Sequence, residues 1–422
     1  MNEIIRDIWE LYGVHSNPFS TAPILVKGGI IPLDCFIGRQ EQTKQLGKIL
    51  GSKGGSRSLV FGDIGVGKTS FVNVVRAYAV VKGYFTPFKE IALQSDWTPD
   101  DFILNTFAGI FATLQLMKIK PVSDETYSKL ESLIAVGFSD KSFNLEILGV
   151  GGGYAKDRKP SSSITSFALT NYFEQICQEI SEKTGHDIII HYNNTELLSE
   201  KSIKKLFENL RDFFQTEGVH FVFVGNLTVK GYFLSIPRFS SIMTDTPISI
   251  EPFTLEEVDK IIKKRFESMQ IEGLDYVVPF TKDCLKMLYD LWGGNIRHIL
   301  NSLSTAVQEL TVEKPVTIDE NILARTLNSV LEKRYYSRIT PPRALDVLKE
   351  IVKREEITNK SLSDLLDLPR SNISGYLRDL EAAGCVYLRR KTGKDKFWSA
   401  DPTMKWMLLR ESKVVQKSLQ TF

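Results

Sequence analysis

The chain has 422 residues, a length that predicts two or three domains. Its hydrophobic fraction of 42% and charged fraction of 25% are typical of a soluble globular protein, and no apolar run approaches the roughly 18 residues that span a bilayer. The net charge is +2, and the first residues carry acids and no long apolar core, so we expect a cytoplasmic protein without a secretion signal. The four cysteines are widely scattered, which fits reduced thiols and argues against a disulfide framework or a zinc site.

Several short patterns open the chain. Residues 2–12 predict a short amphipathic helix, and Asn17-Pro18-Phe19 lies in the loop that follows. The segment Phe36-Ile37-Gly38-Arg39-Gln40-Glu41 then leads into a helix with apolar residues on one face.

A phosphate loop is the most specific pattern in the sequence. Residues 57–61 predict a buried strand, Gly62 to Thr69 match G-x-x-x-x-G-K-[ST], and a helix is expected from about Thr69 to Val81. Glycines let backbone N–H groups turn toward phosphates, Lys68 can neutralise the β- and γ-phosphates, and the Thr69 hydroxyl can bind Mg²⁺. The predicted nucleotide contacts here are Gly62, Asp63, Ile64, Gly65, Val66, Gly67, Lys68, Thr69 and Ser70. The bland alternative is a chance glycine turn, which the flanking strand and helix disfavour.

Strands and helices then alternate. Strands are predicted near 84–93, 187–191, 219–225 and 248–250, and helices at 100–118, 166–183 and 200–217. This alternation predicts a parallel sheet covered by helices on both faces. Residues 120–165 fit neither pattern, and we interpret them as an insertion, either a hairpin or a mobile loop.

ATP hydrolysis needs a carboxylate that holds Mg²⁺ and a group that orients water. Such residues usually follow a neighbouring apolar strand, but strand 187–191 is followed by Asn193 and Asn194. An amide can bond a metal-bound water, although it cannot supply negative charge. Glu196 is two residues further on and is the candidate substitute. We therefore expect nucleotide binding with slow or no turnover; alternatively, both asparagines are only turn residues and the acid lies elsewhere.

Other polar residues are candidates for contacts with the phosphates. Asn226 ends strand 219–225, where it could reach the γ-phosphate or simply form a turn. Thr254 opens an all-helical region that continues to about 335. Within it, Gly293-Gly294-Asn295-Ile296-Arg297 begins a helix that could bring Arg297 onto the phosphates, or leave it as a surface arginine.

A small unit begins after Pro341-Pro342. Helices are predicted at 343–354, 361–366 and 370–382, followed by strand 386–388, a basic turn at 389–394 and Lys396-Phe397-Trp398. Residues 340–422 carry 16 Lys+Arg and 11 Asp+Glu, so this end is basic and the remainder has a net charge of −3. Three helices and a basic hairpin resemble a winged helix-turn-helix, with 370–382 as its recognition helix. The candidate DNA contacts are Arg370, Ser371, Asn372, Ser374, Arg378, Arg389, Arg390, Lys391 and Lys394.

Together these patterns resemble the AAA+/STAND class of P-loop ATPases, especially its origin-initiator-like and archaeal ATPase branches, over about 15–335. Phe36–Glu41 resembles the box that contacts adenine, which implicates Gly38 and Arg39, and Asn17-Pro18-Phe19 resembles an N-P-F found upstream in relatives. Asn226 matches the sensor 1 position, and Gly294–Arg297 resembles sensor 2 of a helical lid. Asn193-Asn194 departs from the Walker B Asp-Glu. Arg238 is near the place of an arginine finger, but is equally a surface residue.

The resemblance implies an α/β P-loop NTPase core at 1–250, with a parallel sheet, helices on both faces and the 120–165 insertion, then an all-α lid at 251–338 and a small winged-helix domain at 339–422. We expect an ATP- and Mg²⁺-binding switch that couples nucleotide state to oligomerisation and to duplex DNA binding. One alternative is a signalling or defence ATPase whose winged helix docks a protein effector. Another is a scaffold with a relic nucleotide site.

Overall fold

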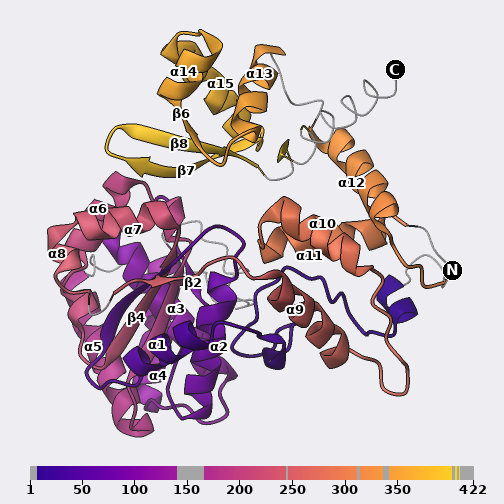
Figure 1. Cartoon of the computed structure of the whole chain (residues 1–422). Coiled ribbons are helices and arrows are strands. Elements are labelled where there is room, and N and C mark those ends of the chain that lie inside the picture. The colour runs from indigo at the N-terminus through magenta and orange to yellow at the C-terminus, as the bar shows by residue number, and fades with distance from the viewer. Residues whose placement is uncertain are drawn as a thin grey trace, which may run out of the picture. The chain divides into compact units, whose positions relative to one another are not determined.

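The computed structural model of the chain divides into two compact units, residues 22–251 and residues 1–21 together with 252–422 (Figure 1). The structure describes residues 7–139, 166–243, 246–310, 314–335, 342–401, 404–405 and 408. None of the helices within these ranges is long and apolar enough to cross a bilayer.

A five-stranded parallel sheet forms the centre of the 22–251 unit. Its strand order is β2-β3-β4-β1-β5, and each adjacent pair is parallel. The strands are β1 (Ser56–Phe61), β2 (Ile91–Ala92), β3 (Ile188–Asn193), β4 (Val219–Gly225) and β5 (Ile248–Ser249). In this order the carboxyl ends of β1, β3 and β4 lie at the same edge, which is where ligands bind in open α/β sheets.

Both faces of this sheet are covered, because alternate strand residues enter two separate cores. Val60, Ile189 and Val222 pack with helices α1 (Gln40–Leu50) and α2 (Lys68–Val81). Leu59, Ile190 and Phe221 belong to the opposite core. The helices of that second core are α3 (Pro99–Leu116), α4 (Asp124–Ser139), α5 (Ser166–Thr184), α6 (Glu200–Asn209), α7 (Leu227–Ser235) and α8 (Pro237–Ser240).

The strands and most helices of this unit agree with the sequence prediction, with four differences. The strand expected near 84–93 is reduced to β2, and the helix expected at 200–217 ends at Asn209. Helix α4 forms within the expected insertion, whose residues 140–165 lie outside the described part of the chain. Sequence did not predict α7 and α8, because the apolar residues of α7 are not gathered on one helical face.

In the second unit, residues 252–335 form the helices α9 (Leu255–Ser268), α10 (Lys282–Trp292), α11 (Ile296–Gln308) and α12 (Glu320–Tyr335). Helix α9 begins after Thr254, where the sequence predicts a helix start, and the Thr254 side chain forms a capping box with Glu257. The N-terminal residues belong here: a short 3₁₀-helix spans Ile8–Tyr12. It lies within the amphipathic helix predicted at 2–12, whose residues 2–6 are outside the described part of the chain.

The Asn17-Pro18-Phe19 segment anchors the N-terminal residues to these helices. The Asn17 amide donates to Ser304 Oγ at 3.0 Å, and the Arg265 guanidinium donates to the Pro18 carbonyl at 3.0 Å. The Phe19 ring packs edge-on against Phe266 at 5.6 Å. Sequence alone places residues 1–21 in the nucleotide-binding domain; in the structure they pack with the C-terminal unit, because these contacts join residues about 250 positions apart.

The C-terminal residues form three helices and a small antiparallel sheet of order β6-β8-β7. The elements are α13 (Pro342–Val352), β6 (Ile357–Thr358), α14 (Asn359–Leu366), α15 (Arg370–Ala382), β7 (Val386–Thr392) and β8 (Asp395–Ala400). The hairpin differs from the predicted basic turn at 389–394. Strand β7 continues to Thr392, so Arg389, Arg390 and Lys391 lie on a strand and the turn is made by Gly393 and Lys394.

Candidate functional site

The phosphate loop connects β1 to α2 through backbone conformations that require glycine. Gly65 and Gly67 have φ angles of 87° and 92°, in the left-handed region. A Cβ on Gly62 would lie 2.2 Å from the Ile250 carbonyl oxygen, so only glycine fits against β5. Because α2 starts at Lys68, the N–H groups of its first turn, which have no acceptor within the helix, lie at the end of the loop.

The Lys68 side chain is held inside the loop. Its ammonium donates to the carbonyl oxygens of Gly62 at 3.0 Å and Asp63 at 2.8 Å, and the residue is only 8% exposed. A phosphate in this loop would therefore meet a positive charge that the backbone has already positioned.

Arg39 also holds the phosphate loop in place. Its guanidinium donates to the carbonyl oxygens of Val66 at 2.7 Å and Glu251 at 2.8 Å, and the side chain is buried. Arg39 has a φ of 61° and follows Gly38, whose φ is 78°. The geometry gives Arg39 a positioning role, while the adenine contact of Gly38 and Arg39 stays a prediction.

Thr69 and Ser70 lie next to each other but contact different segments. The Thr69 hydroxyl donates to the Asn193 Oδ1 at 3.3 Å. The Ser70 hydroxyl instead accepts from the Ile24 amide at 3.1 Å, which joins α2 to the segment that precedes α1. The contact places Asn193 beside the phosphate loop, and its correspondence to a Walker B acid stays a prediction.

The turn after β3 is built around Asn194 and Thr195. Asn194 is left-handed, with a φ of 60°, and the Thr195 hydroxyl donates to the Val224 carbonyl at 2.7 Å. A Cβ on Gly225 would lie 2.3 Å from that hydroxyl, so the end of β4 also has to be glycine. The turn is therefore fixed to both strands that flank the site, whereas a catalytic role for Asn194 stays a prediction.

Glu196 supplies the carboxylate on this turn. Its Oε2 is buried and has no hydrogen-bond partner among the described residues. A buried carboxylate oxygen without a partner is costly, and such groups gather at functional sites. This observation keeps Glu196 as the candidate acid of the site.

The other predicted nucleotide contacts have more ordinary surroundings. Asn226 caps α7, because its Oδ1 accepts from the Val229 amide at 3.0 Å. Arg238 is exposed on α8, and Arg297 is exposed on α11 in the other compact unit. The capping contact accounts for Asn226 as a turn residue, without a phosphate. The phosphate roles of Asn226, Arg238 and Arg297 stay predictions.

A buried polar network, which sequence reasoning missed, lies between α2 and β3. The Arg76 guanidinium donates to Thr86 Oγ1 at 2.9 Å, to Asn73 Oδ1 at 2.7 Å and to the Pro87 carbonyl. It also lies 3.3 Å from the Nδ1 of His191, two residues before Asn193. The available signal was the polar residues on an otherwise apolar helix and strand.

The protonation of this network follows from its burial. Desolvation lowers the pKa of Arg76 to about 10, still well above neutrality, although the nearby Glu90 charge opposes the shift. Desolvation, and then the Arg76 charge, lowers the pKa of His191 well below its ordinary value. A charged Arg76 and a neutral His191 therefore join the helix of the phosphate loop to the strand that carries Asn193.

A second buried histidine lies at the opposite ends of the strands. The Nδ1 of His220 lies 2.8 Å from Ser56 Oγ, and its Nε2 lies 3.4 Å from Asp187 Oδ2. Burial lowers the pKa of His220 to about 4, even though Asp187 acts in the other direction. This imidazole is therefore neutral at pH 7.

In the C-terminal unit, helix α15 buries one face and exposes the other. Ile373, Leu377 and Leu380 are buried at helical spacing. All five predicted contacts on this helix are exposed: Arg370, Ser371, Asn372, Ser374 and Arg378. Ser374 also has an internal role, because its hydroxyl accepts from Asn359 at 3.1 Å, and Asn359 in turn accepts from Trp398 Nε1 at 2.7 Å.

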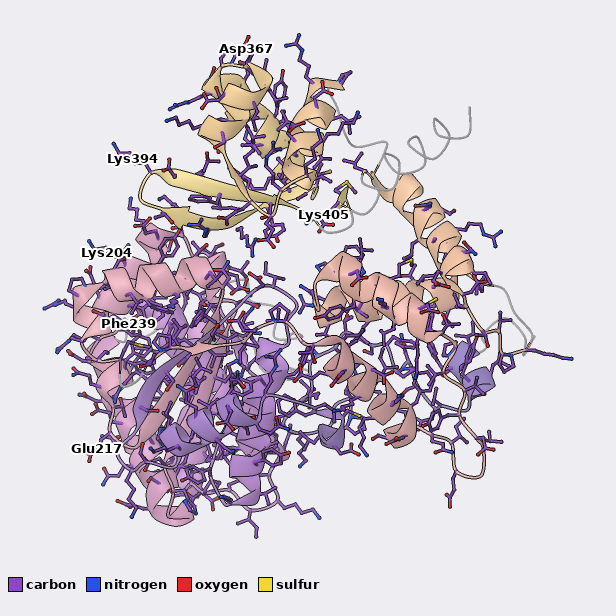
Figure 2. All side chains as sticks on the ribbon, viewed as in Figure 1. Lys204, Glu217, Phe239, Asp367, Lys394 and Lys405 are labelled. Carbon is purple, nitrogen blue, oxygen red and sulfur yellow. The ribbon has the colours of Figure 1, made fainter. Side chains whose placement is uncertain are left out.

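Of the four predicted wing cations, the two arginines lie close to acids and the two lysines are exposed. Arg390 makes a bidentate ion pair with Glu356 and stacks 3.6 Å above the Phe397 ring. Arg389 lies 3.9 Å from Glu355. Hydrogen bonding to Glu356 raises the pKa of Arg390 and lowers that of Glu356. Lys391 and Lys394 are exposed, and Figure 2 shows Lys394 at the tip of the β7–β8 hairpin.

Comparisons with known proteins agree with this architecture. Residues 342–387 match a family described as winged helix-turn-helix DNA-binding. A Walker-type ATPase of Pyrococcus abyssi is similar in structure, with a TM-score of 0.52 and 13% identity over 93% of this chain and 99% of that chain. The chain has the fold of a P-loop ATPase that ends in a winged helix. The predicted fold class is therefore confirmed.

Two further proteins are similar over nearly the whole chain. An uncharacterised HTH-type transcriptional regulator of Methanocaldococcus jannaschii is 22% identical over 404 residues, which are 94% of this chain and 92% of that protein. The Orc2 protein of Aeropyrum pernix, solved as ADPNP–ADP complexes, has a TM-score of 0.49 and 13% identity over 94% of this chain and 98% of its own.

Proposed function

We propose that this chain is a nucleotide-dependent regulator that binds ATP at its phosphate loop and duplex DNA through its winged helix. The carrying observation is that one chain combines a preorganised phosphate loop, with Lys68 held inside it, and a winged helix whose recognition face is exposed. The likeness to an HTH-type transcriptional regulator over 94% of the chain supports the same combination.

The residues around Thr69 suit an Mg²⁺–nucleotide pair with reduced affinity for the metal. Thr69 offers a hydroxyl ligand, and Asn193 offers an amide oxygen 3.3 Å from it. No group of three or more acidic, histidine or cysteine side chains that could hold a metal exists in the described part of the chain. When bound, Mg²⁺ would neutralise charge on the β- and γ-phosphates. Because Asn193 carries no charge, most of the metal's ligands would have to be phosphate oxygens and water.

Turnover at this site is expected to be slow, because the charge that Asn193 lacks is needed most in the transition state. Glu196 is the proposed acid, with Asn194, Asn226 and Arg238 as further candidates from the resemblance. A slow site suits a switch, since the ATP-bound state then persists.

We also infer that nucleotide state controls self-association. Light scattering with and without ATP tests this inference, and an unchanged mass would contradict it.

DNA binding is proposed for the exposed face of α15 and for Lys391 and Lys394. The pairing of Arg389 and Arg390 with acids favours a specific second candidate, in which the winged helix docks a protein effector. Salt dependence distinguishes the two, because phosphate contacts release counterions and make DNA affinity fall steeply with salt.

The deciding experiment measures binding of a labelled duplex to the full-length protein by fluorescence anisotropy, with and without ATP and Mg²⁺. We expect a salt-dependent affinity that ATP changes in the wild type but not in Lys68→Ala. The double variant Lys391→Gln/Lys394→Gln should weaken binding, whereas Lys204→Gln/Lys205→Gln, at two exposed lysines of α6, serves as the matched control. Binding that neither ATP nor the wing variant changes would overturn the proposal.

A further inference from the structure

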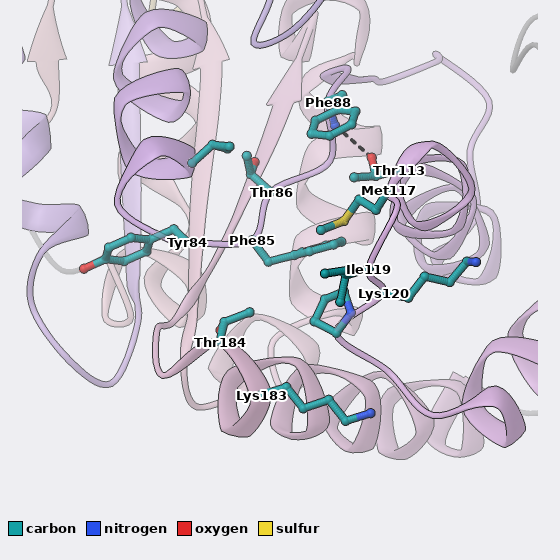
Figure 3. Close-up of a pocket in the computed structure, with 13 residues that line it drawn as sticks. Tyr84, Phe85, Thr86, Phe88, Thr113, Met117, Ile119, Lys120, Lys183 and Thr184 are labelled. Atoms are coloured by element: carbon teal, nitrogen blue, oxygen red, sulfur yellow. Dashed lines mark hydrogen bonds between the residues drawn. The ribbon is translucent and has the colours of Figure 1, made fainter.

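A cavity of about 370 Å³ lies at the edge of the 22–251 unit, away from the phosphate loop. The C-terminal ends of α2, α3 and α5 and the segment between α2 and β2 enclose it (Figure 3). Its lining residues include Val80, Phe85, Met117, Ile119, Lys120 and Lys183. The volume is within the range of small-molecule sites.

This cavity and the nucleotide site belong to opposite ends of the sheet. Phe85 pairs with Ile188, the first residue of β3, whereas Asn193 at the site is the last residue of that strand. Helix α2 spans the distance, since Lys68 begins it in the phosphate loop and Val81 ends it next to the cavity lining. A ligand here would not compete directly with a nucleotide.

The walls of the cavity offer a ligand apolar contact and few hydrogen bonds. Its three threonines already have partners. Thr86 accepts from Arg76, Thr113 accepts from the Phe88 amide at 2.9 Å, and Thr184 donates to the Ile180 carbonyl at 2.9 Å. Figure 3 shows the Phe85, Met117 and Ile119 side chains close together in the cavity. The body of a suitable ligand is therefore apolar.

The charged side chains that line the cavity are both lysines. The Lys120 ammonium lies 4.8 Å from the centre of the Tyr127 ring, and the Lys183 ammonium lies 3.0 Å from Glu179. The lining residues themselves include these two lysines and no acid. Even with Glu179 counted, the surroundings favour an anion. Ile119, which also lines the cavity, leaves 86% of its surface exposed for further apolar contact.

We propose that this cavity binds a small amphiphilic carboxylate, with its aliphatic or aromatic body against Phe85 and Met117 and its negative head near Lys120 and Lys183. The proposal is independent of the nucleotide and DNA roles. It follows from the combination of an apolar wall, satisfied polar groups and a positive rim.

Isothermal titration of the full-length protein with dodecanoate, below its micelle concentration, tests this site. Dodecanol and butyrate are the controls for the head group and the tail, and displacement of the fluorescent probe anilinonaphthalene sulfonate gives a second reading. We expect saturable binding of one dodecanoate per chain, with dodecanol binding roughly tenfold more weakly and butyrate not binding. Absence of saturable dodecanoate binding, or equal affinity for dodecanol, would overturn the proposal.

Two variants assign any binding to this cavity. Val80→Trp fills the cavity and should abolish binding, while Val81→Trp, whose side chain is not part of the lining, should leave it unchanged. Lys120→Gln/Lys183→Gln should weaken dodecanoate roughly tenfold without changing dodecanol. Thermal unfolding of each variant establishes that it is folded. Equal effects of the two tryptophans, or no effect of the lysine pair, would place the binding elsewhere.

Discussion

The hydroxyl of Thr69 donates to the side-chain oxygen of Asn193 across 124 positions of sequence, at 3.3 Å. This contact joins the start of α2 to the end of β3. We propose that Asn193 stands where magnesium-dependent hydrolysis calls for a carboxylate. On this proposal, the missing negative charge limits ATP hydrolysis at the site.

Replacing Asn193 by Asp should therefore increase activity. The carboxylate keeps the size of the side chain and adds the missing charge, so ATP hydrolysis should rise roughly tenfold or more in the presence of Mg²⁺. A phosphate-release assay measures the change. Asn209→Asp, at an exposed asparagine that ends α6, is the matched control and should give no comparable gain. If the two variants behaved alike, Asn193 would not be the metal-side residue.

Replacing Glu196 should slow ATP hydrolysis and leave ATP binding unchanged. Its buried Oε2 has no partner among the described residues, so Glu196→Gln breaks no observed hydrogen bond of that oxygen. We expect ATP affinity, measured by fluorescence of a labelled nucleotide, to stay within about twofold of wild type. Any residual hydrolysis should fall roughly tenfold or more. Unchanged hydrolysis would return Glu196 to a structural role.

Arg76→Met should destabilise the 22–251 unit. The substitution leaves Thr86, Asn73 and the Pro87 carbonyl without their buried donor, a loss of about 3 kcal/mol in the free energy of unfolding. Urea denaturation measures it, with Arg238→Ala as the exposed control, for which we expect a change of at most about 0.5 kcal/mol. A loss no larger than that of the control would show that methionine packing replaces the network.

Stability should decrease in mild acid because of His220. In the folded chain this imidazole stays neutral down to about pH 4, whereas in the unfolded chain it takes up a proton near the ordinary pKa of 6.5. The unfolded state therefore binds more protons between these values, and acid favours unfolding. The expected loss from pH 7 to pH 5 is roughly 2 kcal/mol, and it is absent above the unfolded pKa.

The matched variant for this pH effect is His220→Asn, which can keep a polar contact to Ser56 and does not titrate. Its free energy of unfolding should vary less with pH by about the same amount. Urea denaturation at pH 7, 6 and 5 compares the two proteins. Parallel pH profiles would assign the acid sensitivity to other groups, among them His191.

On the wing, Arg390 and Lys394 should separate stability from DNA binding. Arg390→Ala removes the partner of Glu356 and should lower thermal stability, and Glu356→Ala should have a non-additive effect with it. Lys394→Ala should leave thermal stability unchanged and reduce the salt slope of DNA binding by about one. Additive effects at Arg390 and Glu356 would mean that the ion pair contributes nothing.

Local patterns in the sequence were sufficient for much of this architecture. Gly65, Gly67 and Lys68 of the phosphate loop, the apolar strands and the capping residues of α9 act through neighbours within a few positions, so their interpretation needs no tertiary information. The same holds for the buried face of α15. It does not hold for α7, whose sequence lacks a helical apolar face, or for residues 1–21, whose packing partners lie about 250 positions away.

Sequence by itself determined that this protein has a phosphate loop, a covered parallel sheet and a basic C-terminal unit, because each arises from short-range periodicity and composition. Only the tertiary structure decided which side chains meet. In the folded chain Asn193 accepts a hydrogen bond from Thr69, and Arg390 pairs with Glu356. Arg76, Asn73 and His191 form one buried network. These pairings depend on strand order and register, which bring residues more than 30 and up to 124 positions apart into hydrogen-bond distance.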